Sequence, residues 1–166
     1  MEEFQLKRIH ENAIPEALAR AERYRLLGDP VQAESICRDV LRVEPGSQPA
    51  LVILILALTD QFSGAQSSPG PRVAREYVAQ LGDEYQKLYY SGLISERQAR
   101  AMRGRGLAAA FAYEGLREAM DFYEKAERVS PPGNDDAILR WNSCVRTIRR
   151  ENLRPRAETD QTLSLE

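Results

Sequence analysis

The chain has 166 residues and a formal net charge of −2 at neutral pH, with 43% hydrophobic and 29% charged residues. This length predicts one domain, and the composition is that of a globular protein with an ordinary core. Because acidic and basic residues are balanced and spread along the chain, the charge argues against nucleic acid as the main partner.

The first residues and the apolar runs predict a cytoplasmic protein without membrane insertion. The first residues are polar and acidic and lack the basic and apolar regions of a signal peptide. The most apolar run covers only residues 50–58, against the roughly 20 residues that a bilayer-spanning helix needs. The two cysteines are too few for a disulfide framework.

Apolar residues recur at helical spacing along the chain, whereas strand patterns bounded by hairpin turns are nearly absent. The sequence therefore predicts an all-α protein. Asn12 and Asp29 can each cap a helix, and proline follows in the first turn of two helices, where it is tolerated. In the first part of the chain, helices are expected at residues 2–11, 13–27, 30–43 and 48–62.

The loop at 63–72 is rich in Gly, Pro and Ser and separates these helices from the rest. Ser91 and Gly92 are expected to end the helix that follows this loop. The remaining helices are expected at residues 72–90, 96–113, 116–129 and 136–152. The buried stripe of the last helix is predicted to consist of Ala137, Trp141, Cys144, Val145 and Ile148. The domain is expected to cover 1–152, with a loosely ordered tail at 153–166.

Two segments align between Pro45 and Pro131, at an offset of 86 residues. Ala33 then falls on Ala119 and Cys37 on Tyr123. The pattern resembles the tetratricopeptide repeat family, whose helical hairpins of about 34 residues stack on one another. The resemblance covers roughly 13–132 in three units, of which the middle one is irregular. It implies a solenoid of helical hairpins, with the seventh helix capping its end.

In this family the first helix of each hairpin lines the concave side of the stack. The resemblance therefore implies a partner-binding groove made of Leu18, Glu22, Arg25, Val52, Leu56, Thr59, Arg105, Ala108 and Phe111. Some members bind a terminal carboxylate with a Lys and Asn clamp. That ligand is not predicted here, because the corresponding positions hold Leu18, Glu22, Val52 and Leu56.

The helix containing residues 50–58 is apolar on every face, and such a helix is normally buried on every face. Three segments could bury this helix: the chain's own fourth helix or tail, a second copy of the protein, or an amphipathic segment of another protein.

Few residues suggest chemistry. His10 is the only histidine, and Cys37 and Cys144 lie at positions expected to pack in the core. Asp135 and Asp136 stand at a helix start, where carboxylates favour the helix dipole. We therefore expect no metal, no cofactor and no enzymatic activity.

Arginines gather in two groups, and the simplest interpretation is that both lie on solvated helix faces. The groups are Arg97, Arg100, Arg103 and Arg105, and Arg146, Arg149, Arg150, Arg154 and Arg156. The favoured function is a non-enzymatic scaffold or adaptor that binds a peptide or helix of a partner protein in the groove. The alternatives are a binder of nucleic acid or acidic ligands through the arginines, and a structural homo-oligomer such as a homodimer.

Overall fold

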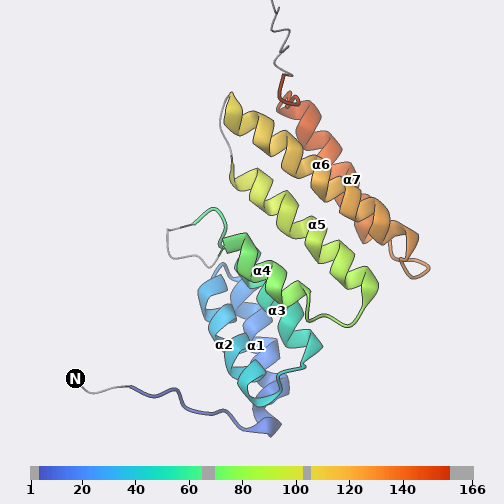
Figure 1. The fold of residues 1–166 in the computed structure, drawn as a ribbon. Helices are drawn as coiled ribbons and strands as arrows, with labels where there is room; N and C mark the ends of the chain where they lie inside the picture. The colour runs from blue at the N-terminus through green and yellow to red at the C-terminus, as the bar shows by residue number, and fades with distance from the viewer. Residues whose placement is uncertain (1–3, 65–69, 103–105, 158–166) are drawn as a thin grey trace, which may run out of the picture.

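The computed structural model describes residues 4–64, 70–102 and 106–157, and within them the chain is all-α, without strands. Figure 1 shows the helices in chain order. They are a short 3-10 helix η1 (Glu11–Ala13), α1 (Ile14–Leu26), α2 (Pro30–Val43), α3 (Gln48–Thr59), α4 (Gly70–Val78), α5 (Glu84–Ala101), α6 (Leu107–Arg128) and α7 (Asp136–Arg150).

The predictions for α1, α2 and α3 are confirmed to within a few residues. Asp29 caps α2, because its Oδ1 accepts a hydrogen bond from the Gln32 N–H at 3.2 Å. Ser47 caps α3 in the same way through the Ala50 N–H, at 3.4 Å. The helix expected at 2–11 is wrong, since residues 4–10 have no regular secondary structure. Asn12 does not cap α1 either, because the N-cap position is Ala13.

In the second half the break before α7 and the helix expected at 136–152 are confirmed, whereas the two breaks expected within residues 90–116 are wrong. Asp83 begins α5, where its Oδ1 accepts from the Gln86 N–H at 2.8 Å. The long helix expected at 72–90 is therefore two helices, α4 and α5. Ser91 and Gly92 lie inside α5, and Gly115, where a second break was expected, lies inside α6.

Both misread glycines lie where two helices approach closely. A Cβ on Gly92 would lie 2.7 Å from Cε1 of Tyr123, and a Cβ on Gly115 would lie 2.8 Å from Cβ of Ala99. Glycine is needed here for the contact between α5 and α6, and the helices accept its lower propensity.

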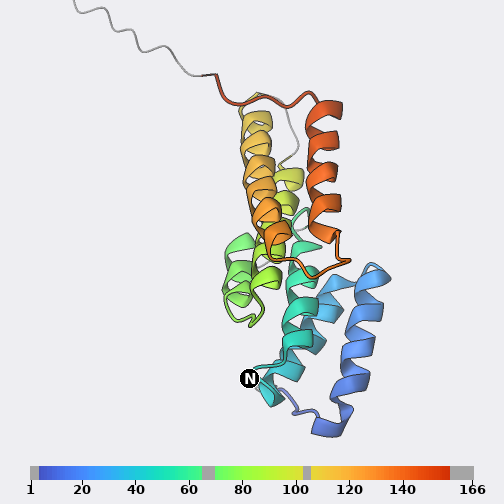
Figure 2. The same ribbon diagram turned by 90° about the vertical axis from the view of Figure 1, so that its right-hand side faces the viewer.

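Each helix packs against the next along the chain, and α1 also packs against α3, and α3 against α5. Figure 1 shows α1, α2 and α3 at one end of the molecule and α5, α6 and α7 at the other. Figure 2, turned by 90°, shows the same division. The three helices α1, α3 and α5 thus lie in a row, with α3 in the middle.

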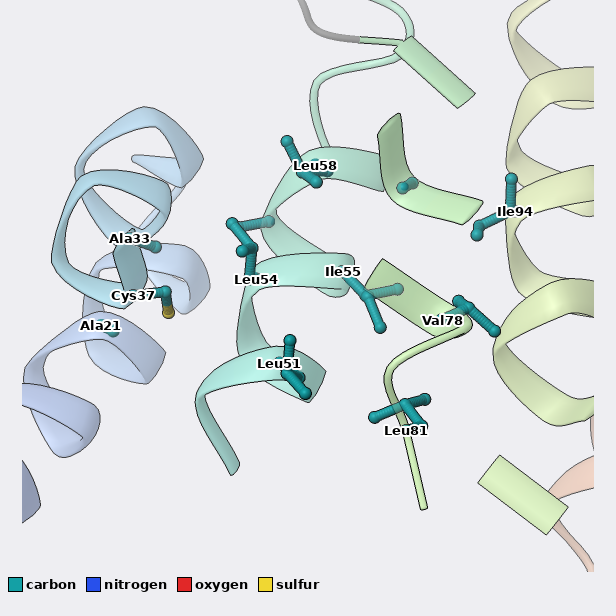
Figure 3. Close-up of a cluster of buried hydrophobic side chains, with 12 residues drawn as sticks. Ala21, Ala33, Cys37, Leu51, Leu54, Ile55, Leu58, Val78, Leu81 and Ile94 are labelled. Atoms are coloured by element: carbon teal, nitrogen blue, oxygen red, sulfur yellow. The ribbon is translucent and has the colours of Figure 1, made fainter. Parts of the chain in front are cut away.

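The first of two hydrophobic cores surrounds α3. Figure 3 shows α3 between Ala21, Ala33 and Cys37 on one side and Val78, Leu81 and Ile94 on the other. Most side chains of α3 are fully buried by α1, α2, α4 and α5. The chain itself therefore supplies most of the covering that this apolar helix requires.

The second core lies between α5, α6 and α7 and includes Ala119, Tyr123 and Cys144. Trp141 was expected in the buried stripe of α7, but its side chain is 38% exposed, and Thr147 is buried instead. Leu153 also packs in this core, so the packed structure continues past residue 152. Residues 158–166 lie outside the described part of the chain.

We expect Gly92→Ala to lower the free energy of unfolding by about 1–3 kcal/mol, as overpacking does. The same change at an ordinary helix position would raise it by about 1 kcal/mol. The Tyr123 ring cannot move away freely, because its hydroxyl is bonded to Glu96. Urea unfolding followed by circular dichroism measures the change. Gly82→Ala, between α4 and α5, is the control for adding a Cβ without a clash, because a Cβ there meets only Gln48 Oε1 at 3.8 Å. Equal stability of the two variants would contradict the close contact.

Candidate functional site

Six of the predicted groove residues lie on α1 and α3, which pack against each other. Leu18, Val52 and Leu56 are half-buried, and Glu22 is exposed. Val52 packs against the first core. Arg25 is half-buried and Thr59 is buried, and both belong to a polar cluster at the carboxyl ends of the helices. The packing of α1 on α3 brings these six positions to neighbouring helices.

The predicted groove residues of the third hairpin do not join them. Ala108 and Phe111 lie in the first turns of α6, and the helix that packs beside α3 is α5. The sequence analysis expected one helix at 96–113, with a break near Gly115, and took that helix as the one that lines the groove. Residues 107–113 in fact belong to α6. Arg105 lies outside the described residues.

Asp60, just after α3, is shared between two arginines from different helices. Its Oδ2 lies 2.7 Å from Nε of Arg25 on α1, and its Oδ1 pairs with Nη1 of Arg97 on α5. The same Nη1 donates a hydrogen bond to Oγ1 of Thr59 at 2.8 Å. These contacts join the ends of three alternate helices.

Glu96 on α5 is the second shared carboxylate, and its side chain is only 1% exposed. Its Oε1 lies 2.9 Å from Nη2 of Arg100 and 3.5 Å from Nη1 of Arg140 on α7. Its Oε2 accepts a hydrogen bond of 2.6 Å from the Tyr123 hydroxyl on α6. Burial, together with the neighbouring Glu96, raises the pKa of Tyr123 above its usual range. The tyrosine therefore stays a hydrogen-bond donor to the carboxylate.

Arg100 extends this cluster to α7. Its Nη1 donates to Oγ1 of Thr147 at 2.7 Å, and its Nη2 donates to Oγ of Ser143 at 3.1 Å. Arg97 and Arg100 are therefore partly buried and paired with carboxylates, whereas the interpretation from the sequence placed them on solvated helix faces. The arginines of the second group that lie on α7 (Arg146, Arg149 and Arg150) and in the following segment (Arg154 and Arg156) are exposed.

A polar cleft of about 470 Å³ opens between the ends of α3 and α5 and is lined by Thr59, Asp60, Phe62, Ser63, Arg97, Arg100 and Ala101. The carboxyl end of a helix carries a partial negative charge of about one half. That charge, with Asp60 and Glu96, balances much of the charge on the arginines. The cluster is suited to joining helices rather than to attracting an anion.

The two cysteines are not suited to nucleophilic chemistry. Burial raises the pKa of Cys37 to about 12, with a smaller contribution from Glu34. Burial also raises the pKa of Cys144 to about 12, with a smaller contribution from Glu96. Because the thiolate is the reactive form, both side chains behave as small core residues near neutral pH. In the described part of the chain, no group of three or more His, Cys, Asp or Glu side chains could hold a metal ion.

A second cleft, of about 360 Å³, lies on the other side of the α5–α6 junction. Its lining consists of Ser95, Gln98, Ala99, Met102, Phe111, Glu114, Gly115 and Glu118. Phe111 is 52% exposed, and Met102 and Leu107 nearby are also exposed. The sequence analysis found only Phe111 of these residues, because it extended one helix through residues 101–106.

No helix among the described residues is long and apolar enough to cross a membrane. Comparisons with protein-family models, curated proteins and solved structures found no match for this chain.

We expect the free energy of unfolding to fall as the pH rises above 9. The unfolded thiols release their protons near pH 9.0, whereas Cys37 and Cys144 in the native protein hold theirs up to about pH 12. The native state then binds more protons than the unfolded state, so raising the pH favours unfolding. Each thiol contributes up to about 1.4 kcal/mol per pH unit.

Urea titrations at several pH values between 7 and 10.5 measure this slope. The Cys37→Ala, Cys144→Ala double variant should show a shallower decline. The slope is compared rather than the absolute stability, because truncating two core residues lowers stability at every pH. Identical slopes for the two proteins would show that the thiols titrate normally in the native state.

Proposed function

We propose that this chain is a tetratricopeptide-like helical scaffold that binds a segment of another polypeptide and has no catalytic role. The observation that carries the proposal is the order of helix contacts. Each helix packs on its neighbour in sequence, and α3 also packs on α1 and on α5. Stacked helical hairpins produce this order, because the first helices of successive hairpins form one row.

The helix lengths support an irregular middle hairpin. The second helix of that unit, α4, has 9 residues, whereas its counterparts α2 and α6 have 14 and 22. The last helix, α7, packs on α6 and contributes Ala137 and Cys144 to the second core.

The proposed contact surface is the exposed side of α1 and α3. Leu18 and Glu22 are separated by one helical turn, and Val52 and Leu56 have the same spacing on α3. Half-buried apolar side chains beside an exposed carboxylate suit an amphipathic segment that carries a basic residue. Because most of α3 is buried by the chain itself, this surface is smaller than the groove predicted from the sequence.

An acidic ligand or a nucleic acid is the weaker alternative. Arg97 and Arg100 are already paired with Asp60 and Glu96, so binding through them would require breaking those pairs. The exposed arginines of α7 remain for such a ligand. Binding through them would weaken steeply with added salt.

We expect Glu22→Arg to remove the partner polypeptide from an affinity capture with the full chain in native lysate, read by mass spectrometry. Glu22 is exposed, so the fold should be unchanged. The matched control is Glu127→Arg, which makes the same change of charge at an exposed position of α6. Val52→Glu and Leu56→Glu are less suitable, because both side chains are half-buried.

The expected result is at least a tenfold loss of one polypeptide with Glu22→Arg and none with Glu127→Arg, about the effect of one charged contact. Capture of the same polypeptides by all three proteins would contradict the proposed surface. Capture of none above the background of an unrelated bait would contradict the scaffold function itself.

A further inference from the structure

The exposed side of α1 and α3 continues onto α5 through the carboxylate of Asp60. Asp60 pairs with Arg25 of α1 and with Arg97 of α5. Glu22 lies three residues before Arg25, on the same side of α1. Arg100 of α5 lines the same polar cleft as Asp60 and Arg97. The three helices therefore present one continuous face near their carboxyl ends.

The same face continues onto α7, because Nη2 of Arg100 donates a hydrogen bond to Oγ of Ser143 at 3.1 Å. Four residues of α7 follow one another at spacings of four, three and four: Leu139, Ser143, Arg146 and Arg150. Such spacing places them in one stripe along the helix, which we call the α7 stripe. The residues of α7 that pack in the second core lie on another side of the helix. Leu139 is 63% exposed, and both arginines of the stripe are exposed.

The arginines of the α7 stripe differ from several exposed arginines on other helices. Four of those pair with a glutamate four residues away: Arg20, Arg38, Arg72 and Arg128. Arg146 has Asn142 and Arg150 at these positions, so its helix neighbours are uncharged or repel it. Arg150 pairs with the exposed Glu151 beside it, at 3.3 Å. A positive charge in the last turn of a helix is favourable, which accounts for Arg150 but not for Arg146, one turn earlier.

The exposed charges on this face change sign from one end to the other. Glu22 is exposed at the α1 end, and Arg146 and Arg150 are exposed at the α7 end. The charges between them are paired within the fold, and Val52 and Leu56 supply half-buried apolar side chains. A polypeptide segment that follows this face therefore needs a basic residue at one end, apolar residues in the middle and an acidic residue at the other end.

The number of helices crossed sets the length of that segment. Packed helices lie about 8–10 Å apart, so three steps from α1 through α3 and α5 to α7 cover about 24–30 Å. An extended chain covers this distance with about eight or nine residues.

We propose, on the basis of the scaffold function above, that this face binds one partner segment with charges of both signs. The basic end of the segment pairs with Glu22 of α1, and its acidic end pairs with Arg146 and Arg150 of α7. A nucleic acid carries negative charge along its whole length, so Glu22 would repel it. A polypeptide can carry both signs of charge in the required order.

Fluorescence anisotropy of labelled model peptides with the purified full chain tests the proposal. Each peptide has about twelve residues and a leucine-containing middle. The bipolar peptide has lysines at one end and glutamates at the other, and it is made in both chain directions. The two control peptides have lysines at both ends or glutamates at both ends. The wild type should bind one bipolar peptide at least about tenfold more tightly than either control peptide.

Two variants test the two ends of the face separately. Glu22→Arg and the double variant Arg146→Glu, Arg150→Glu should each lower the affinity for the bipolar peptide at least about tenfold. All three side chains are exposed, so the fold should be unchanged. The matched control is Arg154→Glu, Arg156→Glu, which makes the same change of charge at exposed residues after α7 and should leave the affinity unchanged.

A loss of affinity with Glu22→Arg but not with the α7 variant would overturn the extension to α7 and leave the scaffold function intact. An equal loss with the control variant, or equal binding of all peptides by the wild type, would overturn the proposal, because net charge alone would then explain the binding. The chain itself carries acidic residues after 157. If the bipolar peptide binds only after Glu158→Gln and Asp160→Asn are introduced, the chain's own segment occupies the α7 end, and the proposal is wrong.

Discussion

Two carboxylates, each shared between two arginines, hold the alternate helices of this fold together. Asp60 joins α1 and α5 at the end of α3, and Glu96 joins α5 to α7 and, through Tyr123, to α6. The two hydrophobic cores are separate, with α5 contributing to both. The ion pairs, together with the apolar contacts of α5 in both cores, link the half of the molecule around α3 to the half around α6. Any surface that spans alternate helices depends on this link.

The burial of Glu96 makes this constraint strict. A carboxylate out of water is costly unless charged and hydrogen-bonding partners surround it, and loss of one partner leaves the charge uncompensated. Glu96 has Arg100, Arg140 and Tyr123 around it, so its partners come from α5, α6 and α7, and a shift of any of these helices would cost it a partner. Tyr123 also fills the space above Gly92. The same arginines are thereby paired within the fold, whereas Glu22 and Phe111 are exposed.

Local signals were enough to predict α1, α2, α3 and α7 to within a few residues. Asp29 and Ser47 cap their helices through contacts only three residues away, and such contacts can be read from the sequence. A glycine can end a helix or allow a close contact between two helices, and a single sequence does not distinguish the two roles. Gly92 and Gly115 were read as breaks, although each permits a contact with a helix distant in sequence. The wrong breaks then moved Ala108 and Phe111 to the wrong helix. The pairing of Arg25 with Asp60 has no local signal at all, because it depends on the packing of α1, α3 and α5.

A double-mutant cycle between Asp60 and Arg97 measures most directly whether the shared carboxylates join alternate helices. Asp60→Asn, Arg97→Gln and their combination are compared with the wild type in urea unfolding. Both side chains are about one quarter exposed or less, so solvent screens the pair only in part. We expect a coupling energy of about 1 kcal/mol or more. Additive effects of the two substitutions would contradict the role of Asp60 as the link between α3 and α5.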